Sequence, residues 1–398
     1  MKKILFVSGL SIKPHSGGVE RITHLLATEL ISKGYNVMYL ALKCEDNDKN
    51  VLYSAPQYFF PTSDVFSQNN VVFYNSFIQE YRIDIIINQQ CPGNESYLFL
   101  NIDPDNKKNV KVITVCHNKP TCGLDYFHRY SEKGISMSVI ETVKYCIKML
   151  LFPVWRIIRE RRGKIFYGKL YQFILMHSDN FVVFTSAYAK EIGKLIKRDV
   201  NDIDVIVIPN PNTYSSHCEN RFEKQKQVLY VGRFDCKQKR PDFLLKIWQK
   251  VYKKHPDWEL IFCGSGEMDT IMRKFVEKHR LQNVTFYGNV DPLPFYQRAS
   301  ILAMTSIYEG FPMVLTEAMK NGCVPIAFDS FEAVNDVIIP RKTGVLVQHF
   351  KLSEFSQKLS DLMTDEKQRE YMSNEAAHHV KNFDMHNVIE KWIRLIEK

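Results

Sequence analysis

The feature that most constrains the fold is a repeated alternation of short apolar segments with amphipathic segments. KILFVS (3–8) is followed by VERITHLLATELISKG (19–34), whose apolar residues recur at helical spacing, and then by YNVMYLAL (35–42). Strands without polar alternation are buried on both faces, as in a parallel sheet between layers of helices. The pattern starts again after residue 227. The sequence therefore predicts an α/β chain with two doubly wound, Rossmann-like domains that face one another across a cleft, where the ligands of such sheets bind.

A polar linker separates the two repeats. PNPNTYSSHCENRFEKQKQ (209–227) is rich in Pro, Asn, Ser and charged residues. We predict an N-terminal domain at 1–212, a linker at 213–226, a C-terminal domain at 227–383 and a final helix at 384–398 that could pack on either domain. The other predicted strands are DIIINQ, VKVITVCHN, FVVFTS and DVIVIPN before the linker, and VLYVGRF, WELIFCGSG, VTFYGNV, ASILAMTS, VPIAFDS and GVLVQ after it.

Composition excludes several classes of protein. Of the 398 residues, 45% are hydrophobic and 24% are charged, which is typical of a globular protein. The nine cysteines form no C-x-x-C pair, so we expect reduced thiols and a cytoplasmic location. MLLFPVW (149–155) is the longest apolar run and is far shorter than the roughly 18 residues that span a bilayer. The net charge of +9 favours anionic partners, but no nucleic-acid-binding motif is present.

The stretch EGFPMVLTEAMKNG (309–322) predicts a short helix at Phe311 to Asn321, with Gly322 just past its end. Glu309 then stands at the helix N-terminus, where unpaired N–H groups favour a carboxylate or a phosphate. Glu317 lies inside the helix among apolar residues, and a carboxylate there needs a polar partner. The two interpretations are a helix cap with a solvated glutamate, or a ligand site.

Other candidates lie at the ends of predicted strands. Gly17 and Gly18 precede the first helix, where glycines let a phosphate or sugar approach the backbone. His117 follows KVITVC, at the carboxyl end of a strand. Arg233 closes VLYVGR and Lys239 follows in the same loop, so both could stabilise a departing diphosphate. The alternatives are an ordinary turn, a structural histidine and a solvated run of charges.

Metal-binding patterns are lacking in the sequence. Asp103 and Asp105 form an Asp-x-Asp, but DPDN is typical of a turn. We therefore predict neither a metal site nor a cofactor.

The segment KYCIKMLLFPVWRIIRERRGK (144–164) combines basic and apolar residues at near-helical spacing. This pattern is typical of a helix that lies on an anionic bilayer surface, and also of an ordinary surface helix. The candidate membrane-surface residues are Lys148, Trp155, Arg156, Arg159, Arg161 and Arg162.

Taken in order, these motifs resemble the retaining glycosyltransferases of family 4 with the GT-B fold, of the bacterial surface-polysaccharide type, across nearly the whole chain. The E-x7-E signature of that family corresponds to Glu309 and Glu317, and its strand-end VGR with a following lysine corresponds to Arg233 and Lys239. GGVE (17–20) and VIPNP also lie where the family has them. One departure is that Ser330, Phe331 and Glu332 replace a common glycine pair, so the contacts of that loop cannot be inferred.

The resemblance implies a role for each matching residue. Glu309 would bind the donor hexose, Glu317 the ribose hydroxyls, and Arg233 and Lys239 the leaving diphosphate, with His117 near the transferred sugar. The implied catalytic residues are Arg233, Lys239, Glu309 and His117. The implied donor-binding residues are Gly17, Gly18, Arg233, Lys239, Gly288, Val290, Glu309, Gly310, Phe311, Pro312, Met313, Val314 and Glu317.

The resemblance also implies the reaction. A hexose would pass with retention from a nucleotide sugar, with UDP as the expected nucleotide, to an acceptor bound by the N-terminal domain. We expect a lipid-linked oligosaccharide as the acceptor, no required metal, and a peripheral position on the inner face of the cell membrane. Two alternatives stay open: a nucleotide-sugar epimerase of similar architecture, and a non-catalytic protein that binds nucleotides or lipid surfaces.

Overall fold

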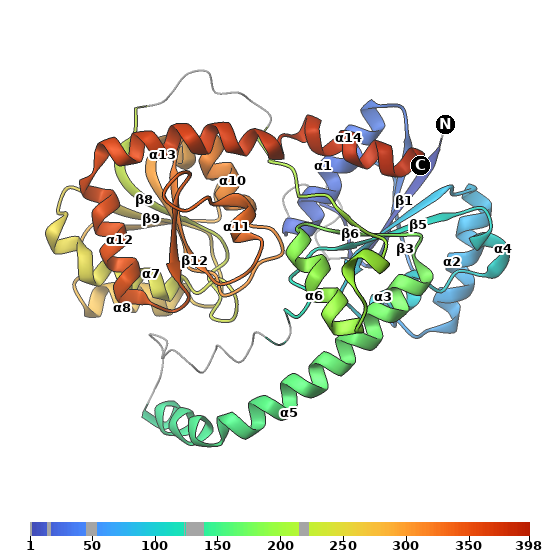
Figure 1. Cartoon of the computed structure of the whole chain (residues 1–398), viewed down its shortest axis with the longest axis horizontal. Helices are drawn as coiled ribbons and strands as arrows, with labels where there is room; N and C mark the ends of the chain where they lie inside the picture. Colours follow the sequence, from blue (N-terminus) through green and yellow to red (C-terminus); the bar gives the residue numbers. More distant parts are fainter. Residues whose placement is uncertain (1, 14–16, 45–53, 123, 125–138, 215–222) are drawn as a thin grey trace. The chain divides into compact units, whose positions relative to one another are not determined.

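The structure, a computed structural model, describes residues 2–13, 17–44, 54–122, 124, 139–214 and 223–398, with the backbone alone at 139–156. The chain divides into two compact units (Figure 1). The first unit comprises Met1–Pro120, Lys164–Thr213 and Met385–Lys398, and the second comprises Thr121–Gly163 and Tyr214–Asp384. Residues 121–163 thus belong to the second unit and not, as the sequence predicts, to the N-terminal domain. The difference arises in one long helix, α5 (Val139–His177), which runs through the boundary at Gly163.

The first unit is built on a seven-stranded sheet in the order β3-β2-β1-β4-β5-β6-β7, and every paired strand is parallel. The strands are β1 (Lys3–Leu10), β2 (Asn36–Lys43), β3 (Gln57–Phe59), β4 (Ile85–Cys91), β5 (Lys111–Cys116), β6 (Asn180–Val183) and β7 (Val205–Val207). Helices connect them: α1 (Gly18–Ser32), α2 (Gln68–Tyr81), α3 (Glu95–Phe99), α4 (Pro104–Lys107), α5, α6 (Ser186–Ile196) and a 3₁₀ turn at Val200–Asp202.

The C-terminal helix α14 (Met385–Glu397) belongs to the first unit. It buries the apolar face formed by Val388, Ile389, Trp392, Leu395 and Ile396. Its last carbonyl groups accept hydrogen bonds from two lysines, Lys2 Nζ to Ile396 O at 2.9 Å and Lys111 Nζ to Leu395 O. Cations are favourable at a helix C-terminus because the carbonyl groups there carry partial negative charge. The Tyr35 hydroxyl also donates to Glu397 Oε1 at 2.6 Å. Hydrogen bonds to its backbone and to a side chain therefore attach α14 to the first unit.

The second unit contains a six-stranded parallel sheet in the order β10-β9-β8-β11-β12-β13. Its strands are β8 (Gln225–Val231), β9 (Glu259–Cys263), β10 (Val284–Gly288), β11 (Ala299–Met304), β12 (Val324–Asp329) and β13 (Val345–Gln348). Its helices are α7 (Pro241–Val251), α8 (Asp269–Lys278), α9 (Leu293–Arg298), α10 (Met313–Lys320), α11 (Val334–Val337), α12 (Leu352–Thr364) and α13 (Glu366–His379), with 3₁₀ turns at Tyr252–Lys254 and Val380–Phe383.

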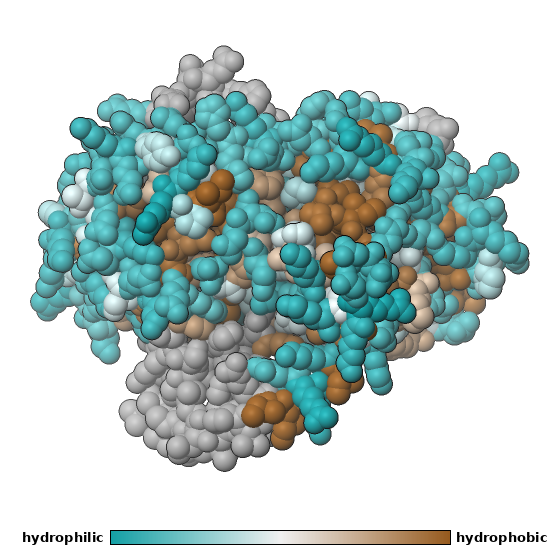
Figure 2. All heavy atoms as spheres, in the orientation of Figure 1, coloured by the Kyte–Doolittle hydropathy of each residue, from teal (hydrophilic) through white to brown (hydrophobic). Residues whose placement is uncertain are grey.

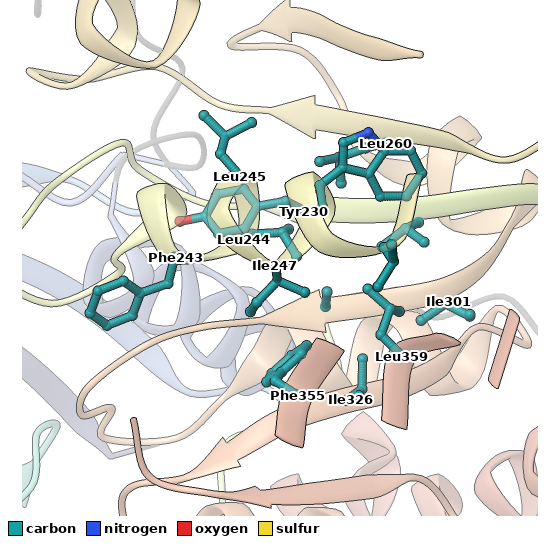
Figure 3. Packing of buried hydrophobic residues seen from close by; sticks show 14 of the residues in the cluster. Tyr230, Phe243, Leu244, Leu245, Ile247, Leu260, Ile301, Ile326, Phe355 and Leu359 are labelled. Atoms are coloured by element: carbon teal, nitrogen blue, oxygen red, sulfur yellow. The ribbon is translucent and has the colours of Figure 1, made fainter. Parts of the chain in front are cut away.

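Alternate residues of the strands supply the core of the second unit. Leu260 of β9, Ile301 of β11 and Ile326 of β12 join one buried cluster with side chains of α7 and α12, as Figure 3 shows. Successive strand residues point to opposite faces of a sheet, and the intervening Ile261 and Leu302 are also buried. Both faces are therefore covered, which explains why the strands read as continuous apolar runs.

The predicted pair of doubly wound sheets is confirmed, and all twelve predicted strands are present. β3 was missed, because three residues are too short to show a period. The helix predicted at 311–321 is shorter at its start, since Pro312 is the N-cap of α10 and not part of its first turn. Its end is as predicted, with Gly322 at a φ of +79°. Within the described residues, no helix is both long enough and apolar enough to cross a membrane.

Candidate functional site

The loops after β8 and β11 lie side by side at the carboxyl edge of the second sheet. The two strands are parallel neighbours, so their carboxyl ends share one edge. Two hydrogen bonds join the loops: Ile307 N donates to Gln238 O at 2.7 Å, and the Thr305 hydroxyl donates to Arg240 O at 2.8 Å. Ligands of doubly wound sheets bind beyond this edge.

Glu309 is bonded to the neighbouring loop and does not cap α10. Its residue is 7% exposed, Oε1 lies 2.6 Å from Lys239 Nζ, and Oε2 accepts from Gln238 Nε2 at 3.1 Å. Helix α10 has no side-chain cap at its N-terminus, so the capping interpretation was wrong. A buried carboxylate is costly unless it is paired and hydrogen-bonded, and Lys239 and Gln238 provide both.

Arg233 joins the same network through an amide. Its side chain is 73% exposed, and Nη2 donates to Gln238 Oε1 at 3.2 Å. The Gln238 amide thus accepts from Arg233 and donates to Glu309 and to Tyr308 O. If the Gln238 amide were rotated by 180°, its NH₂ group would face the Arg233 guanidinium and its oxygen would face the oxygens of Glu309 and Tyr308. The three neighbours therefore fix the orientation of the amide. Gln238 therefore links Arg233, which the family resemblance predicts to bind the leaving group, with Glu309, which it predicts to bind the sugar.

Hydrogen bonds within the loop that carries Lys239 hold its backbone in place. Asp235 Oδ1 accepts from the backbone N–H groups of Lys237, Gln238 and Lys239 at 3.0, 2.7 and 3.3 Å. Arg240 is buried, with its guanidinium bound to both oxygens of Asp242 at 2.9 and 3.0 Å. Arg240 is therefore a structural residue, whereas Arg233 presents its charge to solvent.

Glu317 has a protein partner that the sequence did not reveal. It lies in α10, is 2% exposed, and Oε2 accepts a hydrogen bond from the Tyr296 hydroxyl at 2.8 Å. Tyr296 is fully buried in α9. The interpretation of Glu317 as a solvated helix residue was wrong, and the need for a polar partner is met at least in part by Tyr296.

The residues between Glu309 and Glu317 form the entry to α10. Gly310 and Phe311 are buried before the helix, and the Phe311 ring packs edge-on against Phe383. Pro312 is the N-cap, and Met313 and Val314 begin the helix as half-buried residues. Their backbone lies at the end of a helix, where a partial positive charge favours anions.

Gly288 and Val290 lie along the same edge of the sheet. Gly288 ends β10 with a φ of +73°, and its carbonyl accepts from Gly264 N at 2.7 Å. Val290 is exposed in the loop that follows. The second unit thus places its predicted donor-binding residues at the end of β10, in the loops that follow β8, β10 and β11, and in α10.

In the first unit, His117 lines a cavity of about 300 Å³ at the carboxyl ends of β1, β2, β4 and β5. His117 is 8% exposed, and burial lowers its pKa from 6.5 to about 3. Because the lowered pKa keeps the ring neutral and Nε2 is hydrogen-bonded to Gln89 Oε1, which can accept only, the single proton lies on Nε2. Besides His117 and the amides of Gln89 and Gln90, the cavity is lined by the charged residues Glu20, Lys43 and Glu95, so it offers both neutral and charged hydrogen-bonding groups to hydroxyls.

Gly17 and Gly18 lie at the start of α1 in the same unit. Gly17 is the N-cap, and its carbonyl accepts from Arg21 N at 3.0 Å. A Cβ at Gly17 would come within 2.6 Å of Glu20 Oε2, and Glu20 lines the cavity that contains His117. The first helix therefore begins beside this cavity.

No metal site is found in the described residues, where no three His, Cys, Asp or Glu side chains cluster to hold an ion. Asp103 is the N-cap of α4, and Asp105 pairs with Lys108 at 2.8 Å. Of the predicted membrane-surface residues, the side chains of Lys148, Trp155 and Arg156 lie outside the described part, whereas Arg159, Arg161 and Arg162 are exposed on α5.

Comparisons of sequence link the second unit to known enzymes. Residues 216–379 match the family model for glycosyl transferases group 1. An uncharacterized glycosyltransferase of Haemophilus influenzae is 29% identical over 191 residues, which cover 48% of this chain and 54% of that protein. The amylovoran biosynthesis glycosyltransferase AmsD of Erwinia amylovora is 29% identical over 227 residues, covering 53% and 63%. The chain thus spans little more than half the length of these relatives.

Solved structures settle the architecture. A mutant of S. aureus TarM, in complex with UDP and other ligands, superposes with a TM-score of 0.74 at 14% identity and covers 100% of both chains. The lipopolysaccharide outer core galactosyltransferase WaaB gives 0.69 at 17% identity and covers 99% of both. The chain has the GT-B fold. The two predicted Rossmann-like domains are confirmed, and the resemblance to glycosyltransferases is supported for residues 216–379, which match group 1.

The neutral state of His117 in the GT-B chain predicts a pH-dependent stability. Below about pH 6.5 the unfolded chain binds a proton at His117, whereas the folded chain does so only near pH 3. Acidification through this window therefore favours unfolding, by up to about 3 kcal/mol between pH 6.5 and pH 4. We expect His117→Asn to remove this part of the pH dependence of the unfolding free energy, measured by urea denaturation at several pH values.

The control is His386→Asn, which removes a histidine from the exposed face of α14. If the unfolding free energies of His117→Asn and the wild type fall in parallel from pH 6.5 to pH 4, the assignment of His117 as a buried neutral histidine is contradicted.

Proposed function

We propose that this GT-B chain is a retaining glycosyltransferase that moves a hexose from a UDP-sugar to a glycan acceptor. The observation that carries the proposal is the network of Arg233, Gln238, Lys239 and Glu309 at the carboxyl edge of the second sheet. This network lies inside the segment that matches group 1 glycosyl transferases. UDP is favoured because structures similar to this chain, including TarM and Anabaena HepE, contain it.

In this proposal the second unit binds the donor. Glu317 holds the ribose hydroxyls, and Glu309 binds hydroxyls of the hexose. Lys239 is paired with Glu309 at 2.6 Å, whereas Arg233 is largely exposed, so Arg233 supplies the more accessible charge for the leaving diphosphate. Positive charge held where negative charge develops stabilises the transition state without a dedicated base. The leaving phosphate itself then helps to take the proton of the acceptor hydroxyl.

The cavity beside His117 in the first unit has polar lining groups that support a hydroxyl-rich acceptor, such as a saccharide. The proton on His117 Nε2 leaves Nδ1 as a nitrogen that accepts hydrogen bonds. A relative from Campylobacter jejuni, 26% identical over 195 residues, is named for transfer to an undecaprenol-linked saccharide. We therefore propose a lipid-linked oligosaccharide of a surface polysaccharide as the acceptor.

A lipid-linked acceptor would bring the protein to a membrane, and α5 has a surface suited to one. Ile158, Ile165 and Met176 are exposed and lie within about 20° of one another around the helix, at 100° per residue. The exposed Arg161, Arg162 and Lys169 lie on the same side of α5, beside this apolar stripe. Figure 2 shows hydrophobic and hydrophilic residues intermixed along the described part of α5. Such a face suits the cytoplasmic surface of an anionic bilayer.

The two functional assignments in the donor site predict opposite kinetic effects. Glu317→Gln weakens an interaction present in both ground and transition states, so the donor KM should rise while kcat changes little. Arg233→Ala removes charge stabilisation that grows as the diphosphate departs, so kcat should fall about 100- to 1000-fold. Steady-state kinetics with UDP-hexoses and purified lipid-linked acceptors measure both effects.

Arg273→Ala is the control, because Arg273 is an exposed arginine of the same unit that pairs with Asp269. Full kcat in a folded Arg233→Ala variant would contradict the assignment. Conversion of the donor to an isomer without any acceptor would instead indicate an epimerase.

We also propose that transfer needs no divalent cation, since Arg233 and Lys239 can take the charge of the leaving group. Activity should be unchanged after dialysis against EDTA, measured with and without added magnesium or manganese. Loss of activity in EDTA and its return with metal would contradict this proposal and direct attention to Asp103 and Asp105.

The α5 surface predicts salt-sensitive binding to anionic vesicles. Replacing Arg159, Arg161 and Arg162 with serine should weaken co-sedimentation with phosphatidylglycerol vesicles by on the order of 100-fold, because each basic residue contributes about 1 kcal/mol. The matched control replaces three exposed basic residues at the end of α6, Lys194, Lys197 and Arg198. Equal vesicle binding by wild type and the α5 variant would remove the membrane surface from the proposal.

A further inference from the structure

The bond between Tyr296 and Glu317 joins two helices of the second unit. Tyr296 lies in α9, Glu317 lies in α10, and both residues are buried. The Tyr296 hydroxyl donates to Glu317 Oε2 at 2.8 Å. A hydrogen bond to a charged acceptor is stronger and more directional than one between neutral groups. The direction of the Glu317 carboxylate is therefore set from α9.

Lys224 holds the ends of the same two helices. Its ammonium donates to Tyr296 O and Gln297 O, both at 2.9 Å, near the C-terminus of α9. It also donates to Asn321 O, directly after α10. An ammonium has three hydrogens, and a cation is favourable at helix C-termini. Lys224 thus ties the backbone of Tyr296 to the end of the helix that carries Glu317.

A second set of bonds supports this arrangement. Asn321 Nδ2 donates to Glu317 O at 2.8 Å, and the Cys323 thiol, with one hydrogen to donate, lies 3.0 Å from both Tyr296 O and Ala299 O. The Tyr296 carbonyl therefore receives a bond from Lys224 and lies beside the Cys323 thiol. With its backbone and hydroxyl both held, Tyr296 has little freedom to follow a displaced Glu317.

We infer that Tyr296 is a positioning residue for ribose recognition, which acts by orienting the Glu317 carboxylate, and that Lys224 fixes Tyr296 for this task. The inference rests on the proposed function, in which Glu317 binds the ribose. A carboxylate offers about four acceptor sites, so a bond from Tyr296 is compatible with bonds from ribose hydroxyls. Oriented in advance, Glu317 binds the ribose without losing further side-chain freedom, which raises affinity for the donor.

The test separates a positioning role from general packing by changing the ligand as well as the protein. Affinities of UDP, 2′-deoxy-UDP and 3′-deoxy-UDP are measured by calorimetry for the wild type and for Tyr296→Phe, with GDP and its deoxy analogues in parallel. Tyr296→Phe removes one hydroxyl and keeps the ring. We expect UDP binding to weaken on the order of tenfold. Binding of at least one deoxy analogue should weaken much less, because the hydroxyl that Glu317 would hold is already missing.

Tyr287→Phe is the matched control, because Tyr287 is a half-exposed tyrosine of the same unit whose ring packs against Phe295. It should leave the preference for ribose over deoxyribose unchanged. Lys224→Met should reduce the same preference, and Lys224→Arg should restore part of it. A melting temperature for each variant shows that the folded protein is compared.

The outcomes distinguish the inference from the function on which it rests. Equal weakening of UDP and both deoxy analogues by Tyr296→Phe, or no weakening at all, would overturn the positioning role. A wild-type chain that binds neither UDP nor GDP would instead overturn the proposed function.

Discussion

The largely buried pair of Lys239 and Glu309 is the interaction on which the rest of the proposed donor site depends. The two charges lie 2.6 Å apart, with side-chain exposures of 19% and 9%. Removing either one would leave the other charged and largely out of water, which is strongly destabilising. The pair therefore requires its two loops to stay together, and the backbone bond from Ile307 to Gln238 has the same effect. Gln238 extends the pair to Arg233, so the accessible cation is aligned by a contact made deeper in the protein.

The two units offer very different chemistry at the carboxyl edges of their sheets. The second unit concentrates charge in the loops around Glu309. The first unit presents a histidine that stays neutral at physiological pH, beside the amides of Gln89 and Gln90. The cations Arg233 and Lys239 suit the proposed nucleotide diphosphate, whereas the first unit combines a neutral histidine and amides with the carboxylates of Glu20 and Glu95, which suit the hydroxyls of the proposed acceptor. The same sheet architecture thus supports two kinds of recognition through its loops alone.

The sequence predicted the sheets well and the side-chain partners poorly, for one physical reason. A buried parallel strand can be recognised from its own residues, as a run of apolar residues such as VLYVG. The end of α10 at Gly322 and the acidic residues Glu309 and Glu317 can also be recognised from the local sequence. Partners depend on which loops meet in space. Tyr296 precedes Glu317 by 21 residues, with β11 and a loop between their helices, and nothing in its neighbours distinguishes it from a core tyrosine. Gln238 was likewise one polar residue in a charged loop.

The placement of α14 in the first unit affects how the protein can be made. The other segments of the first unit end at Thr213, and residues 385–397 form its last helix. The side chain of Trp392 in this helix, α14, is buried. At 5–20 residues per second, the ribosome needs on the order of ten to thirty seconds to synthesise the intervening segment. During that time the first unit exists without its last helix, and the apolar surface that α14 covers is open to water or to chaperones. The unit that begins to form first on the ribosome is therefore the last to be finished.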